Sequence, residues 1–285
     1  MILITGASGR VARRTAALLG ERPLRLMSRD PGNVPRLEGT EVVRGDFNDS
    51  KSLDAAFAGI ATAFVVSGQA PPGQRALLHK NAFEAAARAG VQHVVYLSLK
   101  GSGPNSPYPF CRDHYASEQF LAQAGVPHTV LRVAFYLDMF LGKFDPQGVI
   151  RGPGGDGRGA FISREDTAQA AAAVVANPPG DILDITGVEL LSVADVARRL
   201  SVVTGKALRY LPEPAEETRQ RLARAGAPEL AQDLEVGWFQ AIAAGEQGPV
   251  TGDCRRLTGK PPQTLETYLG AFPGLLDPLH EAGRR

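Results

Sequence analysis

The chain has 285 residues, of which 44% are hydrophobic and 21% charged, as in an ordinary folded globular protein. Lys and Arg total 31 against 30 Asp and Glu, so we expect no overall field that attracts nucleic acid or an anionic membrane. Cys111 and Cys254 are far apart and have no metal-type spacing, which favours two reduced thiols and no metal site. The apolar opening of the chain is too short for a signal peptide, and no run approaches the roughly 18 apolar residues of a membrane span. We therefore expect a soluble cytoplasmic protein; its oligomeric state is not indicated.

Short apolar runs alternate with longer Ala-rich segments through the first half of the chain, the pattern of βαβ units. The expected strands are 2–5, 24–27, 41–44, 61–66, 91–98 and 126–133. The expected helices are 10–19, 50–58 (with Ser50 as its N-cap), 74–89 and 115–124. Right-handed crossovers would assemble these strands into one doubly wound parallel sheet, so the predicted class is an α/β fold of the Rossmann type.

After residue 134 the pattern changes, with Gly and Pro concentrated between 142 and 159. Ser163 and Asp166 resemble a capping box that starts a helix running to 176, and 181–185 is an expected strand. Helices expected at 192–204, 215–225 and 228–244 carry no nucleotide signal. We predict a Rossmann domain of residues 1–133 plus roughly 161–186, and a smaller mixed lobe of 134–160 and 187–285 that faces a substrate or partner.

The strongest motif is the turn between the first strand and the first helix, where Gly6 permits a tight turn and Gly9 lets the backbone approach a pyrophosphate. Ala12 takes the third, small position, where helix packs against strand. Free N–H groups at the helix start would face the phosphates. The predicted dinucleotide contacts of this turn are Gly6, Ala7, Ser8, Gly9, Arg10 and Val11.

Arg29 follows the second strand, 29 − 9 = 20 residues beyond Gly9, where a residue that reads the adenine ribose is expected. An acidic side chain there would accept a hydrogen bond from a 2′-hydroxyl, whereas Arg29 offers a planar donor fork to a 2′-phosphate. Asp30 would have to point away. The pattern favours NADP(H) over NAD(H).

These residues, together with 45–47 (Gly-Asp-Phe), 73–75 (Gly-Gln-Arg), 155–157 and 257–262, resemble the NmrA-like family of atypical short-chain dehydrogenases/reductases. The pattern is most similar to the small bacterial NADPH-dependent quinone oxidoreductases. The resemblance implies that Asp46 and Phe47 border the adenine and that Ser67 and Gly68 line the cofactor. It also implies that the segment 134–139 lies by the nicotinamide, with Ala134, Phe135 and Met139 as contacts.

Ordinary short-chain reductases carry a Tyr and a Lys four residues apart on one helix, and this chain has His114 and Glu118 at the matching positions. The resembled reductases have the same pair. His114 is a candidate proton donor whose pKa Glu118 would raise, or a histidine with only a local contact. Tyr115 is offset by one position and is followed four residues later by Gln119, so the Tyr/Lys dyad is absent. Lys100 is another candidate polar group near the ring, or a solvated lysine.

Two further residues bear on the acceptor site. Tyr136 is a candidate for stacking on a flat substrate, and it is equally well explained as a core residue. Met139 stands where family members often carry Asn, which makes the site more apolar.

Two functions compete. The first is an NADPH-dependent oxidoreductase that transfers hydride to a quinone or similar flat electrophile, for which the protein mainly orients the cofactor and shapes an apolar pocket. The second is a non-catalytic redox sensor of the NmrA-like type, whose protein partner would respond to NADP(H). The missing dyad and Met139 favour the sensor, and the reductase-like first half favours the enzyme; the fold alone does not decide.

Overall fold

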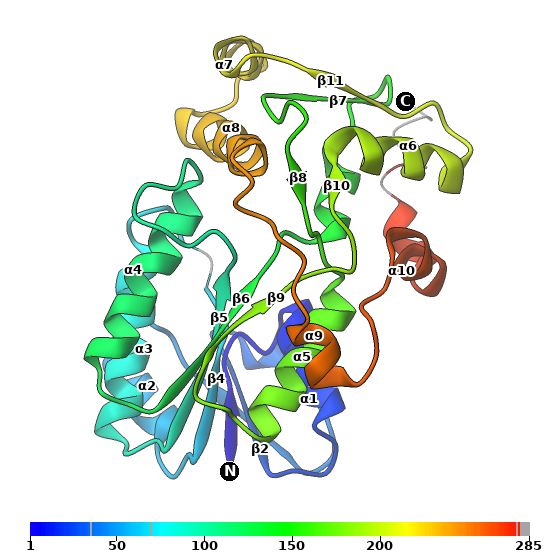
Figure 1. Ribbon diagram of the computed structural model, residues 1–285. Helices are drawn as coiled ribbons and strands as arrows, with labels where there is room; N and C mark the ends of the chain where they lie inside the picture. Colours follow the sequence, from blue (N-terminus) through cyan, green and yellow to red (C-terminus); the bar gives the residue numbers. More distant parts are fainter. Residues whose placement is uncertain (35, 69, 278, 280–285) are drawn as a thin grey trace.

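A seven-stranded, fully parallel sheet forms the centre of the larger part of the molecule, in the order β3-β2-β1-β4-β5-β6-β9 (Figure 1). The computed structural model describes residues 1–34, 36–68, 70–277 and 279. The strands are β1 (Ile2–Ile4), β2 (Leu24–Ser28), β3 (Thr40–Arg44), β4 (Thr62–Val65), β5 (His93–Leu99), β6 (His128–Val133) and β9 (Ile182–Ile185). The strand order reverses between β1 and β4, as in a doubly wound Rossmann sheet, and the predicted fold class is confirmed.

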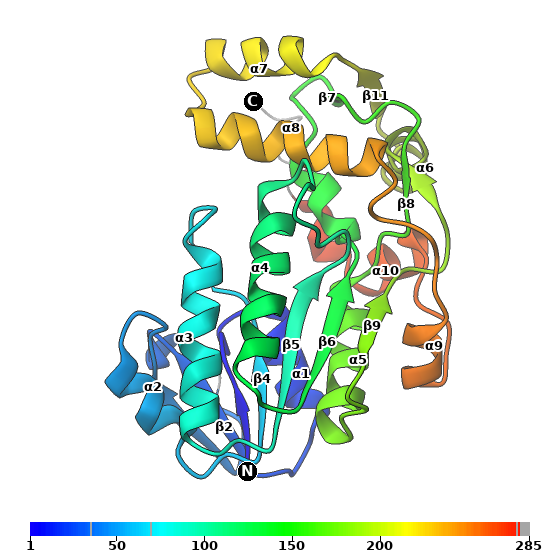
Figure 2. The same cartoon turned by 60° about the vertical axis from the view of Figure 1, so that its left-hand side comes forward.

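Helices cover both faces of this sheet (Figure 2). On one face lie α1 (Arg10–Leu18) and α5 (Arg164–Ala176), and on the other α2 (Ser50–Phe57), α3 (Arg75–Arg88) and α4 (Pro109–Gln123). Buried alanines such as Ala12, Ala16 and Ala168 let α1 and α5 pack closely against each other. The opposite face is built around larger side chains, among them Phe57 and Phe83.

A smaller lobe lies beyond the carboxyl ends of the central strands (Figure 1). Its elements are β7 (Val149–Gly152), β8 (Arg158–Gly159), β10 (Leu191–Ser192), β11 (Arg209–Pro212), α6 (Val193–Thr204), α7 (Ala215–Arg224), α8 (Glu229–Ala243) and α10 (Leu265–Ala271). The described residues also form three short 3-10 helices: η1 (Pro31–Asn33), which follows β2 of the central sheet, η2 (Leu137–Gly142) and η3 (Pro273–Leu276). The lobe has its own core around Trp238, whose ring stacks on Phe135 at 5.4 Å. The predicted division into two domains remains a proposal; α9 (Asp253–Thr258), which falls in the predicted lobe, packs against α5 and β9.

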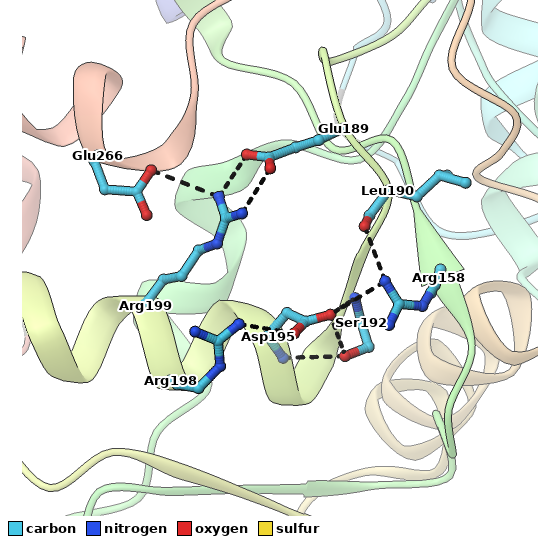
Figure 3. Close-up of polar contacts among 8 residues, drawn as sticks. All are labelled: Arg158, Glu189, Leu190, Ser192, Asp195, Arg198, Arg199 and Glu266. Atoms are coloured by element: carbon cyan, nitrogen blue, oxygen red, sulfur yellow. Dashed lines mark hydrogen bonds and ion pairs between the residues drawn. The ribbon is translucent and has the colours of Figure 1, made fainter.

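Polar contacts at the start of α6 hold the lobe together (Figure 3). The Ser192 hydroxyl accepts a hydrogen bond from the Asp195 backbone N–H at 3.0 Å, and the Asp195 carboxylate accepts one from the Ser192 N–H at 3.2 Å. This capping box, with the bond from the Ser192 N–H as the largest cause, lowers the pKa of Asp195 to about 2. One turn later Arg199 forms a two-pronged ion pair with Glu189 and reaches Glu266 on α10 at 3.6 Å.

Two helix starts differ from the sequence-based expectation. The helix expected at 115–124 begins six residues earlier, at Pro109, because proline fits the first turn of a helix, where no N–H is needed. The N-cap of α2 is Asp49 and not Ser50, since the Asp49 carboxylate accepts from the backbone N–H groups of Lys51 and Ser52. Ser163 caps α5 as predicted.

Candidate functional site

A cavity of about 710 Å³ opens at the carboxyl ends of β1, β2 and β4, the place where α/β sheets bind nucleotides. The turn after β1 forms one wall. Gly6 has φ of +60°, a conformation that glycine tolerates best, and its carbonyl oxygen accepts the Gly9 N–H at 2.8 Å. A Cβ on Gly9 would lie 3.1 Å from that oxygen, so a side chain there would crowd the turn. Thr5 fixes the turn to the neighbouring strand, because its hydroxyl accepts the Val66 N–H at 2.9 Å.

Eight of the predicted cofactor residues line this cavity: Gly6, Ser8, Gly9, Arg29, Asp46, Phe47, Ser67 and Gly68. They come from four separate connections of the chain. The lining also includes residues that were not predicted: Met27, Ser28, Gly45, Asn48, Val66, Ala70, Pro71, Gln74, Leu77, Leu78 and Asn81. Of these, Gly45 and Gln74 lie in segments that the family resemblance had marked, whereas Leu77, Leu78 and Asn81 on α3 belong to no recognisable motif.

Arg29 and Asp30 play different parts at the end of β2. Arg29 is exposed and lines the cavity. The Asp30 carboxylate instead caps η1, accepting from the Gly32 N–H at 3.1 Å and from the Asn33 amide at 2.6 Å. The Asp30 carboxylate is therefore used within its own turn and does not line the cavity, whereas contact of Arg29 with a ribose substituent stays a prediction.

Asp46 and Phe47 lie on the connection between β3 and α2. Asp46 lines the cavity, and one of its carboxylate oxygens accepts a hydrogen bond from the Asn48 N–H at 2.9 Å. The same side chain thus stabilises the turn after β3 and forms part of the cavity wall. Phe47 is buried, and its carbonyl oxygen accepts a hydrogen bond from the Asn81 side chain on α3 at 2.8 Å. This bond ties the wall to α3.

Six predicted cofactor residues lie outside the lining of this cavity. Ala7, Val11 and Ala134 are buried in the sheet core, and Phe135 and Met139 pack in the lobe core. Arg10 extends away to form an ion pair with Asp138 at 3.2 Å. Their contact with a cofactor stays a prediction that the geometry of this cavity does not support.

A buried polar chain leads from the cavity wall into the protein. The Ser67 hydroxyl lies 3.1 Å from Nε2 of His79 on α3, and Nδ1 of His79 lies 3.0 Å from the hydroxyl of Tyr96 on β5. The same tyrosine hydroxyl lies 2.7 Å from Nδ1 of His114 on α4. Burial lowers the pKa of His79 to about 3 and raises that of Tyr96, so both groups are neutral. His79 and Tyr96 were not predicted, because each reads in sequence as a core residue.

The expected partnership of His114 with Glu118 is wrong. The Glu118 carboxylate accepts from the Ser98 hydroxyl at 2.6 Å and from two nitrogens of Arg132 at 3.0 and 2.5 Å. The pKa of His114 is lowered, by burial first and then by the neighbouring His79 and Arg75. The Glu118 carboxylate is engaged instead by a hydroxyl on β5 and a guanidinium on β6. Whether His114 acts on a substrate stays a prediction.

Tyr136 and Lys100 each contact a charged side chain within the protein. The Arg164 guanidinium carbon lies 4.0 Å from the centre of the Tyr136 ring, and burial raises the pKa of Tyr136 to about 12. The Lys100 ammonium is buried and lies 2.8 Å from the Asp184 carboxylate, so the expectation of a solvated lysine is wrong. Neither side chain lines the 710 Å³ cavity.

The described residues offer neither a cluster of metal ligands nor a membrane span. In the described part of the chain, no group of three or more His, Cys, Asp or Glu side chains is arranged to hold a metal ion. None of the described helices combines the length and hydropathy required to cross a membrane.

The family model described as NAD(P)H-binding matches residues 6–178, which is more than half of the chain. The chain is 26% identical over 280 residues to an NAD(P)H azoreductase of Xenophilus azovorans, covering 95% of this chain and 97% of that one. The crystal structure of an NADPH-dependent quinone oxidoreductase from Escherichia coli, complexed with NADPH, superposes with a TM-score of 0.88 at 27% identity, covering 95% of this chain and 99% of the other.

The transcriptional regulator NmrA shares the fold, with a TM-score of 0.75 at 18% identity over 98% of both chains. The glycine turn, the parallel sheet and the cavity agree with these matches, and the resemblance to NmrA-like atypical short-chain dehydrogenases/reductases is confirmed. The chain belongs to the NAD(P)H-binding family.

Proposed function

We propose that this protein binds NADPH in the 710 Å³ cavity and reduces a quinone or a similarly flat electrophile. The observation that carries the proposal is the composition of one cavity, in which the glycine turn at Gly6 and Gly9 and the exposed Arg29 line the same space. Backbone N–H groups of such a turn bind a pyrophosphate, and a free guanidinium binds a 2′-phosphate. Both anionic parts of NADPH therefore have a matching group.

The reaction class is supported by the relatives, one named an azoreductase and another a quinone oxidoreductase. When bound, NADPH supplies a hydride; with one proton from solvent, a quinone becomes a hydroquinone and NADP⁺ is released. The negative charge that forms on a quinone spreads over its ring. A strong dedicated acid is therefore less necessary than for a simple ketone.

The protein's own residues fit such a reaction. His114 occupies the position of the missing tyrosine, and it is neutral because burial lowers its pKa. Its Nδ1 is engaged by the Tyr96 hydroxyl, so Nε2 is the atom left to hold or move a proton. Tyr136 is the weaker candidate, because Arg164 already covers one face of its ring.

The experiment is a measurement of NADPH oxidation with 1,4-naphthoquinone and with the azo dye methyl red, with benzaldehyde as a non-quinone comparison. We expect turnover with the quinone and the dye, and little with the aldehyde. Tight binding of NADPH without oxidation by any of these acceptors would contradict the proposal and favour the sensor.

A further inference from the structure

A second, open groove of about 520 Å³ lies beside the cofactor cavity. Its lining consists of Ala70, Pro71, Pro72, Arg75, Phe110, Leu230 and Leu234. Ala70 and Pro71 also line the cofactor cavity, so the two spaces are neighbours. The groove is built from the loop after β4, the first turns of α3 and α4, and α8 of the lobe. Except for Arg75, every side chain of the lining is apolar.

Arg75 has unusual surroundings for an arginine. Its guanidinium carbon lies 3.7 Å from the centre of the Phe110 ring, and its Nε is buried with no hydrogen-bond partner among the described residues. Burial lowers the pKa of Arg75. The Asp113 carboxylate, which is near enough to affect that pKa, accepts two contacts from the Gly73 N–H at 2.9 and 3.1 Å. No ion pair joins Arg75 to a carboxylate in the part of the chain that the structure describes.

A partly buried charge without a partner costs free energy, and a guanidinium that lies in a groove recovers that cost when an anion binds. Its planar fork of N–H donors matches the oxygens of a carboxylate, sulfonate or phosphate. Phe110, Leu230 and Leu234 offer apolar walls for a ring, and the volume is that of a small-molecule site. No acidic side chain in the lining would repel an anion.

We infer that the groove binds a flat aromatic molecule that carries an oxyanion substituent, and that Arg75 holds this substituent. Under the proposed function, on which this identification rests, the molecule is the electron acceptor. Acceptors with a sulfonate or carboxylate should then be preferred over neutral ones of the same ring system. Leu230 is 42% exposed, so α8 presents the rim of the groove to an arriving ligand.

The experiment begins with a probe that cannot be reduced. Binding of naphthalene-2-sulfonate to the full-length protein, saturated with NADP⁺, is measured by calorimetry for the parent protein, Arg75→Gln, Arg75→Lys and Arg88→Gln. Arg88 lies at the other end of α3 in a surface pair with Asp54, so its substitution changes the net charge equally and leaves the groove intact. Naphthalene-2-methanol serves as the neutral ligand.

We expect Arg75→Gln to weaken the sulfonate about 10- to 100-fold, the range for hydrogen bonds to a charged group, with Arg75→Lys in between and Arg88→Gln unchanged. Affinity for the neutral alcohol should change little. Leu230→Glu adds a carboxylate at an exposed position, and we expect it to weaken the sulfonate alone. Because that variant leaves Arg75 and its packing in place, it tests the groove even if Arg75→Gln folds poorly.

The same variants are then assayed for NADPH oxidation with 1,4-naphthoquinone and 1,4-naphthoquinone-2-sulfonate. We expect Arg75→Gln to raise KM for the sulfonate selectively. Equal losses for both ligands in Arg75→Gln, or no difference from Arg88→Gln, would overturn the inference. An equal loss of affinity for NADP⁺ in Arg75→Gln would also overturn the inference, since Arg75 would then bind the cofactor. Arg75-dependent binding of naphthalene-2-sulfonate with no quinone turnover in the parent protein would support the groove and contradict only the proposed function.

Discussion

The Ser67 hydroxyl, at the wall of the cofactor cavity, lies 3.1 Å from Nε2 of His79, and the direction of this hydrogen bond follows from the contacts behind it. Ser117 donates to the carbonyl oxygen of Asp113 at 2.8 Å, and a carbonyl can only accept. The 2.8 Å contact between Ser117 and Nδ1 of His79 therefore needs its proton on Nδ1. Since burial keeps His79 neutral, Nε2 is then an acceptor, and Ser67 donates to it at 3.1 Å in preference to the Gly68 carbonyl oxygen, which lies 3.3 Å away.

The first prediction is that His79 is the Nδ1–H tautomer and stays neutral down to low pH. Nitrogen NMR of the histidine side chains should show a protonated Nδ1 and an unprotonated Nε2 that do not titrate between pH 5 and pH 8, because burial lowers the pKa of His79 to about 3. Phe83 packs beside His79, with ring centres 6.3 Å apart. The Phe83→Leu variant should therefore shift the NMR signals of His79, which identifies them among the histidine signals. Observation of an Nε2–H signal would show that the chain of hydrogen bonds runs the other way.

The second prediction concerns stability against pH. The pKa of His79 is lowered to about 3, whereas an unfolded histidine titrates near 6.5, so the unfolded state binds the extra proton between these values. The free energy of unfolding should therefore fall as pH drops below about 6.5, by about 2 kcal/mol from His79 alone at pH 5. His114, whose pKa is also lowered, acts in the same direction.

Urea unfolding of the parent protein and of His79→Gln across this pH range provides the measurement. His79→Gln should have a shallower dependence on pH, since glutamine binds no proton. Phe83→Leu should lower stability at every pH and leave the slope unchanged. An identical slope in His79→Gln and the parent protein would rule out His79 as the source.

The third prediction is a preference for NADPH. Arg29 is exposed in the cavity, and charge-assisted hydrogen bonds contribute roughly 1.5–3 kcal/mol each, so NADPH should bind at least about tenfold more tightly than NADH. Arg29→Ala should remove most of that difference and leave NADH affinity nearly unchanged. Calorimetry at fixed salt measures both constants. Equal affinities in the unsubstituted protein would mean that Arg29 does not contact a 2′-phosphate.

The fourth prediction tests the turn. A Cβ on Gly9 would already lie 3.1 Å from the Gly6 carbonyl oxygen, and the branched side chain of Gly9→Val would fill the place where a pyrophosphate approaches. NADPH affinity should fall by about 100-fold or more, equivalent to ~2.7 kcal/mol. Circular dichroism should show that the fold is kept, because φ of Gly9 is −75°, which valine adopts freely. Unchanged binding would show that the phosphates lie elsewhere.

The central sheet and the glycine turn could be predicted from the sequence because buried parallel strands are continuous apolar runs and the turn chemistry is local. The buried His79 could not, since its role depends on Ser67, Tyr96 and His114, which come from three other parts of the chain. The short strands β7, β8, β10 and β11 were missed because two to four residues carry no periodicity. Likewise, the spacing of His114 and Glu118 predicted a contact, and the packing of α4 on β6 supplied a better partner for Glu118.

The last prediction separates structure from catalysis at Glu118. Its side chain is 5% exposed and pairs with Arg132, which is 29% exposed, so removing either partner leaves a buried or half-buried charge unpaired. Breaking a buried pair costs about 3–5 kcal/mol, and we expect about 3 for Glu118→Gln because Arg132 still reaches solvent. Arg132→Gln should cost more, since Glu118 then stays buried as a lone carboxylate.

The double variant, Glu118→Gln with Arg132→Gln, should lose less stability than the sum of the two single variants, because no charge remains unpaired. Urea unfolding gives these values. The kinetics then distinguish the two roles. No hydrogen bond or ion pair joins Glu118 to His114 among the described residues, since Glu118 is bonded to Ser98 and Arg132. The pH profile of kcat for quinone reduction in Glu118→Gln should therefore match that of the parent protein at a temperature where both are folded. His114→Ala should lower kcat about 10- to 100-fold, and Tyr115→Phe should leave it unchanged. A profile that shifts in Glu118→Gln would restore Glu118 as the group that sets the protonation of His114.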